Sequence, residues 1–255
     1  MKLAFIAPTN ALKHISSEGD IEFCLAPYCL KDKKYKQYFI KARKNYRYVI
    51  MDNGAAEGDI IDNDEYVKLA IEMRVREIII PDVIGNMKET ILKLYSFISK
   101  YGWLLKENDI KLHAVIQGRT FKEYAEMYEL LINEPSIDVI GIPFRMNFNQ
   151  LKFVSEYDRA LNRLYFLDNI EKVNKEIHCL GSNNIYEIIE LNKRPYVRSC
   201  DSKLIARYGK ALKILNKEDV YKPKEKIEMD EKLNNKQIKY AIKNIKLLKG
   251  GLNDR

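Results

Sequence analysis

The stretch YRYVIMDNGAAEGDIIDNDEYVKLAIEMRVREIIIPDV, residues 46–83, contains the pattern that decides the fold. An apolar run rich in β-branched and aromatic residues, Tyr46–Met51, precedes a helical pattern over Asp64–Arg74, and a second apolar run follows at Glu77–Ile80. Strand, helix and strand in this order are typical of a βαβ unit, in which the two strands run parallel. We therefore expect a parallel sheet covered by helices.

The same alternation continues on both sides of this unit. Short apolar runs predict eight strands: Leu3–Ala7, Ile21–Ala26, Tyr46–Met51, Glu77–Ile80, Lys111–Ile116, Asp138–Ile142, Glu176–Leu180 and Tyr196–Ser199. Helical patterns lie between most of them: Asp64–Arg74, Asn86–Lys100, Thr120–Ile132, Asn149–Asn162 and Ile185–Leu191. Several of these begin at a capping residue, namely Asn63 or Asp64, Asn86, Thr120 and Asn149.

Eight strands in βα alternation favour a closed α/β barrel of the (β/α)8 TIM type over an open sheet. No glycine-rich dinucleotide turn follows the first strand, which disfavours a Rossmann fold. The first connection, Pro8 to Asp20, is short and only weakly helical, so we expect the barrel to be irregular there.

The composition shifts after about Leu215, which divides the chain into two parts. Residues 1–215 are expected to form the barrel and its catalytic site. Residues 216–255 begin with the charged, Pro-containing segment Asn216–Lys232, a predicted surface excursion. They continue into a basic amphipathic helix, Lys236–Leu248, which extends the fold at its C-terminus and packs on the barrel or on a partner.

Length and composition exclude several classes of protein. The 255 residues suit one α/β barrel, and 46% hydrophobic with 31% charged residues argues against disorder. No apolar run approaches the roughly 20 residues that cross a bilayer. Because Met1–Pro8 is too short and too strand-like for a signal peptide, we expect a cytoplasmic protein without a membrane partner.

The cysteines and histidines do not have the spacing of metal ligands. Cys24, Cys29, Cys179 and Cys200 form neither a CxxC pair nor a zinc ribbon, so we expect reduced thiols near barrel strands and neither a metal nor another cofactor. His113 and His178 fall within predicted strands, where we expect them to be packed and hydrogen-bonded rather than catalytic.

Polar residues and glycines stand at or just beyond six of the predicted strands: Asp52-Asn53-Gly54, Pro81-Asp82-Val83, Ile116-Gln117-Gly118, Gly141-Ile142, Leu180-Gly181 and Asp201-Ser202. Each has a structural alternative, because an aspartate there can cap a helix, a glutamine can bond loop backbone and a glycine can permit a tight turn. Together they predict one site, because the C-terminal strand ends of a barrel meet at one rim. Carboxylates, an amide and backbone N–H groups suit recognition of a heterocyclic base and attack at a glycosidic carbon.

In this order the motifs resemble the tRNA-guanine transglycosylase superfamily, from about residue 46 to about residue 210. The resemblance implies an irregular (β/α)8 barrel that exchanges a guanine in nucleic acid for a 7-deazaguanine base. It assigns Asp201 as the nucleophile at C1′ and Asp52 as the general acid and base on the departing and incoming bases. It also assigns a set of substrate-binding residues: Asp82, Gln117, Gly141, Leu180 and Gly181.

Departures from the family pattern bear on the polymer. The tRNA enzymes of the family carry a Cys3His zinc subdomain after the barrel, and this chain has no cysteine beyond Cys200. Ala55-Ala56 stands where a base-stacking aromatic residue usually follows the first aspartate. Asp201-Ser202 resembles the short, zinc-free phage-type and island-type relatives that insert 7-deazaguanines into DNA. We therefore expect a pentosyltransferase that acts on DNA in preference to tRNA.

Other interpretations remain open at this stage. The barrel could be a queuine-type enzyme of tRNA, could exchange or hydrolyse the base of a free nucleoside or nucleotide, or could be a non-catalytic partner subunit. An oligomer is possible. The net charge of +8 suits a polyanionic partner, with phosphates held by the basic runs Lys33–Lys44, Lys203–Lys213 and Lys236–Lys249. A Lys-rich composition gives the same excess without nucleic acid, in which case these runs are solvated helix faces.

Overall fold

A computed structural model describes residues 1–255 except 56–57, 59–60, 149–154, 173, 217–220 and 254–255. Eight parallel strands form one sheet in the order β1-β8-β7-β6-β5-β4-β3-β2. Their bounds are β1 Lys2–Phe5, β2 Glu22–Leu25, β3 Val49–Asp52, β4 Glu77–Ile79, β5 Lys111–Val115, β6 Val139–Ile142, β7 Glu176–Cys179 and β8 Val197–Ser202. The Leu3 carbonyl accepts hydrogen bonds from the N–H groups of Asp20 and Ile21, at 2.8 and 3.4 Å, and so brings β1 against the start of β2. The predicted (β/α)8 barrel is confirmed.

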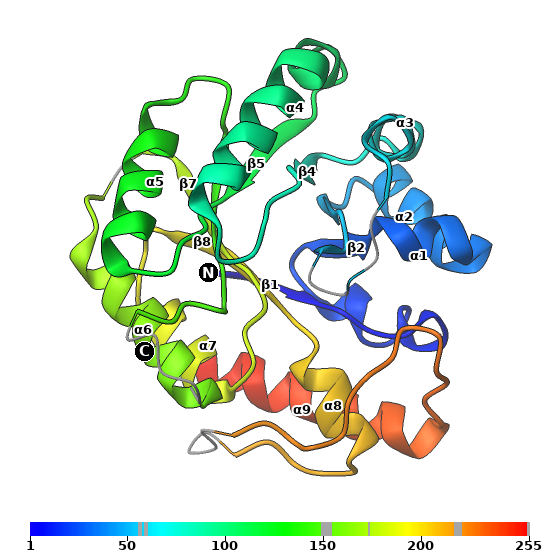
Figure 1. Ribbon diagram of the computed structural model, residues 1–255. Coiled ribbons are helices and arrows are strands. Elements are labelled where there is room, and N and C mark those ends of the chain that lie inside the picture. Colours follow the sequence, from blue (N-terminus) through cyan, green and yellow to red (C-terminus); the bar gives the residue numbers. More distant parts are fainter. Residues whose placement is uncertain (56–57, 59–60, 149–154, 173, 217–220, 254–255) are drawn as a thin grey trace.

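Helices surround the strands (Figure 1). Their bounds are α1 Ala26–Lys31, α2 Lys33–Lys44, α3 Asn63–Met73, α4 Met87–Glu107, α5 Phe121–Asn133, α6 Glu156–Asn169, α7 Ile185–Asn192, α8 Leu204–Lys210 and α9 Asn235–Asn253. Two 3-10 turns, Thr9–Ala11 and Ser16–Glu18, occupy the fully described connection between β1 and β2. This connection is therefore irregular, as the weak helical pattern predicted.

Several predicted helix starts are confirmed and others are wrong. Asn86 and Thr120 cap α4 and α5 by accepting a backbone hydrogen bond from Glu89 and Glu123. The cap of α3 is Asp62 rather than Asn63 or Asp64, because the Asp62 carboxylate accepts from the N–H groups two and three residues on. Helix α4 continues to Glu107, beyond the predicted end at Lys100.

The helix predicted over Asn149–Asn162 is also displaced. Asn149 lies outside the described residues, and α6 begins at Glu156 and continues to Asn169. Ser155 caps it, since the Ser155 hydroxyl accepts from the Asp158 N–H while the Asp158 carboxylate accepts from the Ser155 N–H. This reciprocal capping box explains why the helix begins there.

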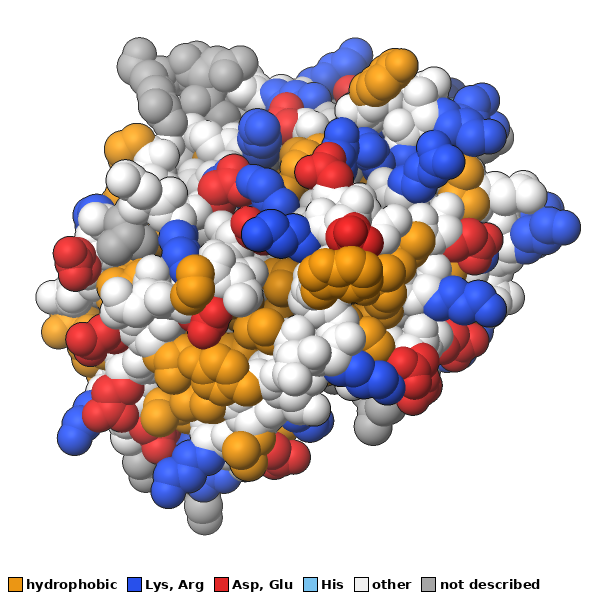
Figure 2. Space-filling model, turned by 90° about the horizontal axis from the view of Figure 1, so that it is seen from above, with side chains coloured by type: hydrophobic (Ala, Val, Ile, Leu, Met, Phe, Trp, Pro, Cys, Tyr) orange, Lys and Arg blue, Asp and Glu red, His pale blue; other side chains and the backbone are white. Residues whose placement is uncertain are grey.

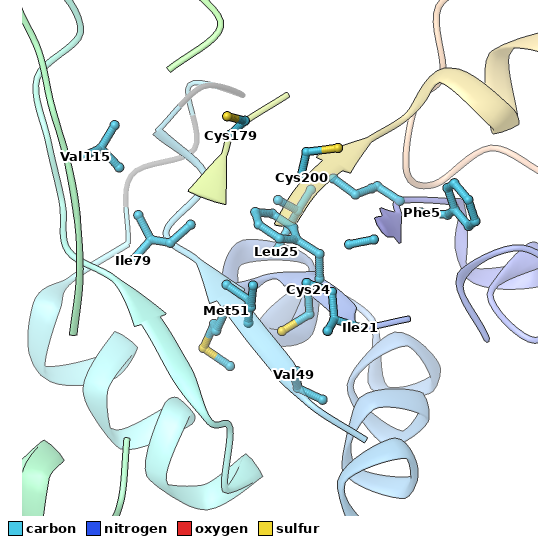
Figure 3. Packing of buried hydrophobic residues seen from close by; sticks show 14 of the residues in the cluster. Phe5, Ile21, Cys24, Leu25, Val49, Met51, Ile79, Val115, Cys179 and Cys200 are labelled. Carbon is cyan, nitrogen blue, oxygen red and sulfur yellow. The ribbon is translucent and has the colours of Figure 1, made fainter. Parts of the chain in front are cut away.

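Side chains from many strands fill one continuous core. Figure 3 shows part of it, with buried residues of β1 to β5, β7 and β8 gathered in one cluster. All four cysteines are buried free thiols, as expected. Burial raises the pKa of the Cys200 thiol, which therefore stays protonated at neutral pH.

The C-terminal helix α9 packs on the barrel rather than presenting its apolar face to solvent. It lies beside α8 and α7 (Figure 1). A Cβ on Gly209 of α8 would lie 2.8 Å from the Ala241 Cβ, so the two helices approach closely because residue 209 has no side chain. Asn244 donates to the Lys213 carbonyl and accepts from the Leu215 N–H, which ties residues after α8 to α9. Of the two packing alternatives, the structure shows the barrel.

Candidate active site

A pocket opens at the C-terminal ends of the barrel strands. All of the predicted site residues except Gly141 line it, namely Asp52, Asp82, Gln117, Leu180, Gly181 and Asp201. Residues that the sequence spaces over about 150 positions therefore meet at one rim, because parallel strands of a barrel all end on the same face.

Asp201 is a residue of β8 itself and does not cap the next helix. Its side chain is only 7% exposed, and its Oδ1 accepts hydrogen bonds from the Gly181 N–H at 2.9 Å and from His178 Nε2 at 3.2 Å. The capping alternative is wrong, because the Ser202 hydroxyl accepts from the Leu204 N–H at the start of α8. That helix spans Leu204–Lys210. The Asp201 carboxylate therefore lines the pocket instead of capping a helix.

Asp82 and Gln117 form one polar unit on the opposite part of the rim. Gln117 Nε2 donates to Asp82 Oδ2 at 2.5 Å, while Gln117 Oε1 accepts from the Gly85 N–H at 3.0 Å. The two bonds fix which end of the amide faces the carboxylate. Burial raises the pKa of Asp82 against the lowering effect of the Gln117 bond. Such a pair can recognise the donor and acceptor edge of a heterocycle.

Asp52 ends β3, and its neighbours make the turn that follows. Asn53 Oδ1 accepts from the Ala55 N–H at 2.7 Å, and Gly54 takes a φ of 80°, which a side chain would disfavour. The Gly54 N–H lies 3.4 Å from Asp52 Oδ1, a longer contact. Asn53 and Gly54 therefore supply the local turn chemistry, and the Asp52 carboxylate faces the pocket.

Gly141 has a different role from the predicted one. It lies within β6 and its carbonyl accepts from the Ile116 N–H of the neighbouring chain segment. A Cβ at this position would lie 2.6 Å from His113 Nε2 and 2.8 Å from Leu180 Cδ1. Glycine is required here because the barrel interior has no space for a side chain, and not because of a tight turn.

Sequence reasoning missed an aromatic residue and a buried cation of the site. Phe144, just after β6, lines the pocket. The fully buried Arg163 of α6 lies over its ring at 5.4 Å, pairs with Glu187 at 2.5 Å, and donates to the Leu180 carbonyl at 2.6 Å. Phe144 could have been found from the sequence, because it follows the strand that contains Gly141. Arg163 could not, because an arginine within a helix gives no signal of burial beside a pocket.

Cationic side chains line the pocket together with the aspartates. They are Arg145, Lys203 and Arg207, contributed by the segments that follow β6 and β8. A pocket lined by both cations and carboxylates suits a substrate that carries negative charge on one part.

A second polar cluster lies in the barrel interior and does not line the pocket. Arg198 donates to both oxygens of Glu77, at 2.7 and 2.9 Å, and His113 Nδ1 lies 2.7 Å from Glu77 Oε1. Burial lowers the pKa of His113 to about 4 despite the nearby carboxylate. Burial also opposes charge on Glu77, but His113 and Arg198 outweigh it and lower the pKa of that carboxyl. As expected, His113 is packed in the core, where its contact with Glu77 holds it.

Because the pKa of buried His113 is lowered, we expect the protein to lose stability in mild acid. His113 has a folded pKa of about 4 against 6.5 in an unfolded chain, so the unfolded state binds the extra proton between these values. The contribution of neutral, buried His113 to the free energy of unfolding is complete above pH 6.5 and is lost as the pH falls towards 4. This contribution is on the order of 3 kcal/mol. Urea unfolding between pH 7 and 4 should show a steeper fall for wild type than for His113→Gln, which cannot titrate. Parallel pH curves for the two proteins would contradict this assignment.

Comparison of the sequence with protein-family models gives no match, and comparison with curated proteins gives none either. Across the described part of the chain, no group of three or more His, Cys, Asp or Glu side chains could hold a metal ion. No helix among the described residues has the length and apolar character needed to cross a membrane. Fold and site together define a (β/α)8 barrel with an acidic and amide-lined pocket at its strand ends.

Proposed function

We propose that this protein is a pentosyltransferase that exchanges guanine in nucleic acid, DNA in preference to tRNA, for a 7-deazaguanine base. The observation that carries the proposal is that Asp52, Asp82, Gln117 and Asp201 line one pocket. These are the residues, in chain order, on which the resemblance to the tRNA-guanine transglycosylase superfamily rests.

The exchange proceeds in two displacements at C1′. The Asp201 carboxylate attacks C1′, the C1′–N9 bond breaks, and guanine leaves with the bonding electrons and takes a proton from Asp52. The incoming base then returns a proton to Asp52, its N9 attacks C1′, and the Asp201–C1′ bond breaks. Both carboxyl groups end in their starting states, so the cycle needs no oxidant, reductant or metal.

The pocket walls support recognition of a flat base. Asp82 and Gln117 provide paired polar groups for the base edge, while Phe144 and Leu180 provide apolar surface. Gly181 lines the pocket, and its N–H donates to Asp201, so this glycine also holds the proposed nucleophile. Gly141 leaves room for the pocket residue Leu180, because a Cβ on it would lie 2.8 Å from Leu180 Cδ1.

Cations at the pocket mouth support a substrate with a phosphate backbone. Arg145, Lys203 and Arg207 line the pocket, and their positive charges suit the phosphates beside a displaced nucleotide. The lysines of α9 at 239, 243 and 246 are exposed on the side of that helix away from its buried residues. On the face shown in Figure 2, by contrast, Lys and Arg are interspersed with Asp and Glu.

A paired base must be flipped out to react, at a cost of a few kcal/mol that is lowest in single strands.

Incorporation of labelled guanine tests the proposal. The protein is incubated separately with single-stranded DNA, duplex DNA, tRNA and guanine mononucleotides, at low and at high salt. We expect label in DNA, with a rate that falls steeply as salt rises because phosphate contacts displace counterions. Labelling of tRNA alone would overturn the choice of polymer, labelling of mononucleotides alone would replace it with a nucleotide enzyme, and no labelling at all would reject base exchange.

A further inference from the structure

A chain of hydrogen bonds inside the barrel ends on Asp201. Arg198 Nε donates to the Ser199 hydroxyl at 3.0 Å, this hydroxyl lies 2.8 Å from His178 Nδ1, and His178 Nε2 lies 3.2 Å from Asp201 Oδ1. Arg198 is itself anchored by both oxygens of the fully buried Glu77. The candidate nucleophile is therefore connected to an ion pair in the barrel interior.

A register shift between β7 and β8 makes this chain possible. Ile177 pairs with Val197, but His178 pairs with Ser199, so Arg198 is an extra residue in β8. In a regular strand, adjacent residues point to opposite faces, whereas a bulge can turn both to one side. Arg198 and Ser199 consequently hydrogen-bond each other, and both contact residues of the barrel interior: Arg198 contacts Glu77 and Ser199 contacts His178.

The hydrogen bond between His178 and Asp201 fixes the position of one imidazole proton. An ionised carboxylate only accepts, so Asp201 as a nucleophile requires a proton on His178 Nε2. When Nδ1 carries no proton, it accepts from the Ser199 hydroxyl, whose oxygen accepts from Arg198. Ring packing holds the imidazole in place, since Phe23 stacks on it at 5.9 Å and His113 meets it edge-on at 5.3 Å.

We propose that His178 is a positioning residue that, together with the Gly181 N–H, holds Asp201 Oδ1 and so selects Oδ2 as the atom that attacks C1′. Both hydrogen bonds fall on Oδ1, and no described residue hydrogen-bonds Oδ2. The inference rests on the proposed role of Asp201 and adds a group that never touches the substrate. His178 is packed and hydrogen-bonded, as expected, and the inference adds a role for it beside the proposed nucleophile.

Two amide substitutions separate this role from simple packing. In His178→Gln the amide nitrogen reaches the place of Nε2 and can still donate to Asp201, whereas in His178→Asn it reaches only as far as Nδ1. We expect His178→Asn to lower kcat for base exchange about 100-fold with KM nearly unchanged, because a misplaced reactive group costs rate rather than binding. His178→Gln should stay within about tenfold of wild type. His14→Gln changes an exposed histidine and is the control.

Melting curves confirm that each variant is folded before its rates are compared. Equal kcat values for His178→Asn and wild type would overturn the inference. Equal losses in the asparagine and glutamine variants would also overturn it, because the loss would then not depend on donation to Asp201.

An activity-independent measurement tests the same assignment. The chain has three histidines, so ¹⁵N–¹H spectra of the imidazoles can be assigned with His14→Gln and His113→Gln. We expect a proton on Nε2 of His178, and a proton on Nδ1 alone would overturn the inference. If no substrate is exchanged, the proposed function fails, but this spectrum still shows whether His178 donates to Asp201.

Discussion

Asp201→Asn protein will show no detectable base exchange. Asparagine has nearly the same shape as aspartate and keeps an oxygen that can accept from the Gly181 N–H, so we expect the fold and nucleic-acid binding to persist. The neutral amide lacks the nucleophilic carboxylate oxygen, so the bond to C1′ cannot form and the covalent route is eliminated. Label incorporation and binding should be measured on the same preparation.

Asp230→Asn is the matched control, because it makes the same chemical change at an exposed aspartate outside the pocket. It should exchange guanine at the wild-type rate. An Asp201→Asn protein with near-normal exchange would instead move the nucleophile to Asp52 and reverse the two proposed roles.

Asp52→Asn should lower the rate of exchange by about 10²–10⁴-fold, which is the usual contribution of a positioned acid or base. The loss affects both halves of the reaction, because the departing guanine gains a proton and the incoming base gives one up. Binding of nucleic acid should change little. Single-turnover release of labelled guanine measures the first half separately from the second.

The result that contradicts this role is an Asp52→Asn protein within about threefold of wild type in both halves, since a proton-transfer group is worth far more. Asp82, whose pKa is raised by burial, would then be the next residue to test as the acid.

The fold could be predicted from the sequence because every βα unit repeats the same local pattern. Each predicted strand is present, since buried parallel strands are continuous apolar runs that propensity and burial both favour. Helix starts were less certain. Asp62-Asn63-Asp64 offers three successive capping residues that propensity does not separate, and the geometry of the chain selects the first.

The pocket residues could be predicted where a strand end alone determines position. Asp52, Asp82, Gln117 and Asp201 are of this kind. Gly141 could not be interpreted correctly, because the atoms that exclude its side chain belong to His113 and Leu180, on the two neighbouring strand segments.

The hydrogen-bond chain to Asp201 was equally hidden from the sequence. It depends on a strand bulge at Arg198, and the pattern of apolar residues does not reveal a bulge. Contacts between distant residues with no shared local pattern appear only once the barrel closes.

Trapping the covalent intermediate tests the central claim most directly. Wild-type protein is incubated with a guanine-containing single-stranded oligonucleotide without added base, denatured, digested and analysed by mass spectrometry. We predict that the peptide containing Asp201 carries the oligonucleotide through the sugar with guanine lost, and that the same peptide of Asp201→Asn is unmodified. An adduct on any other residue, or no adduct from a preparation that exchanges labelled guanine in a parallel assay, would contradict the account.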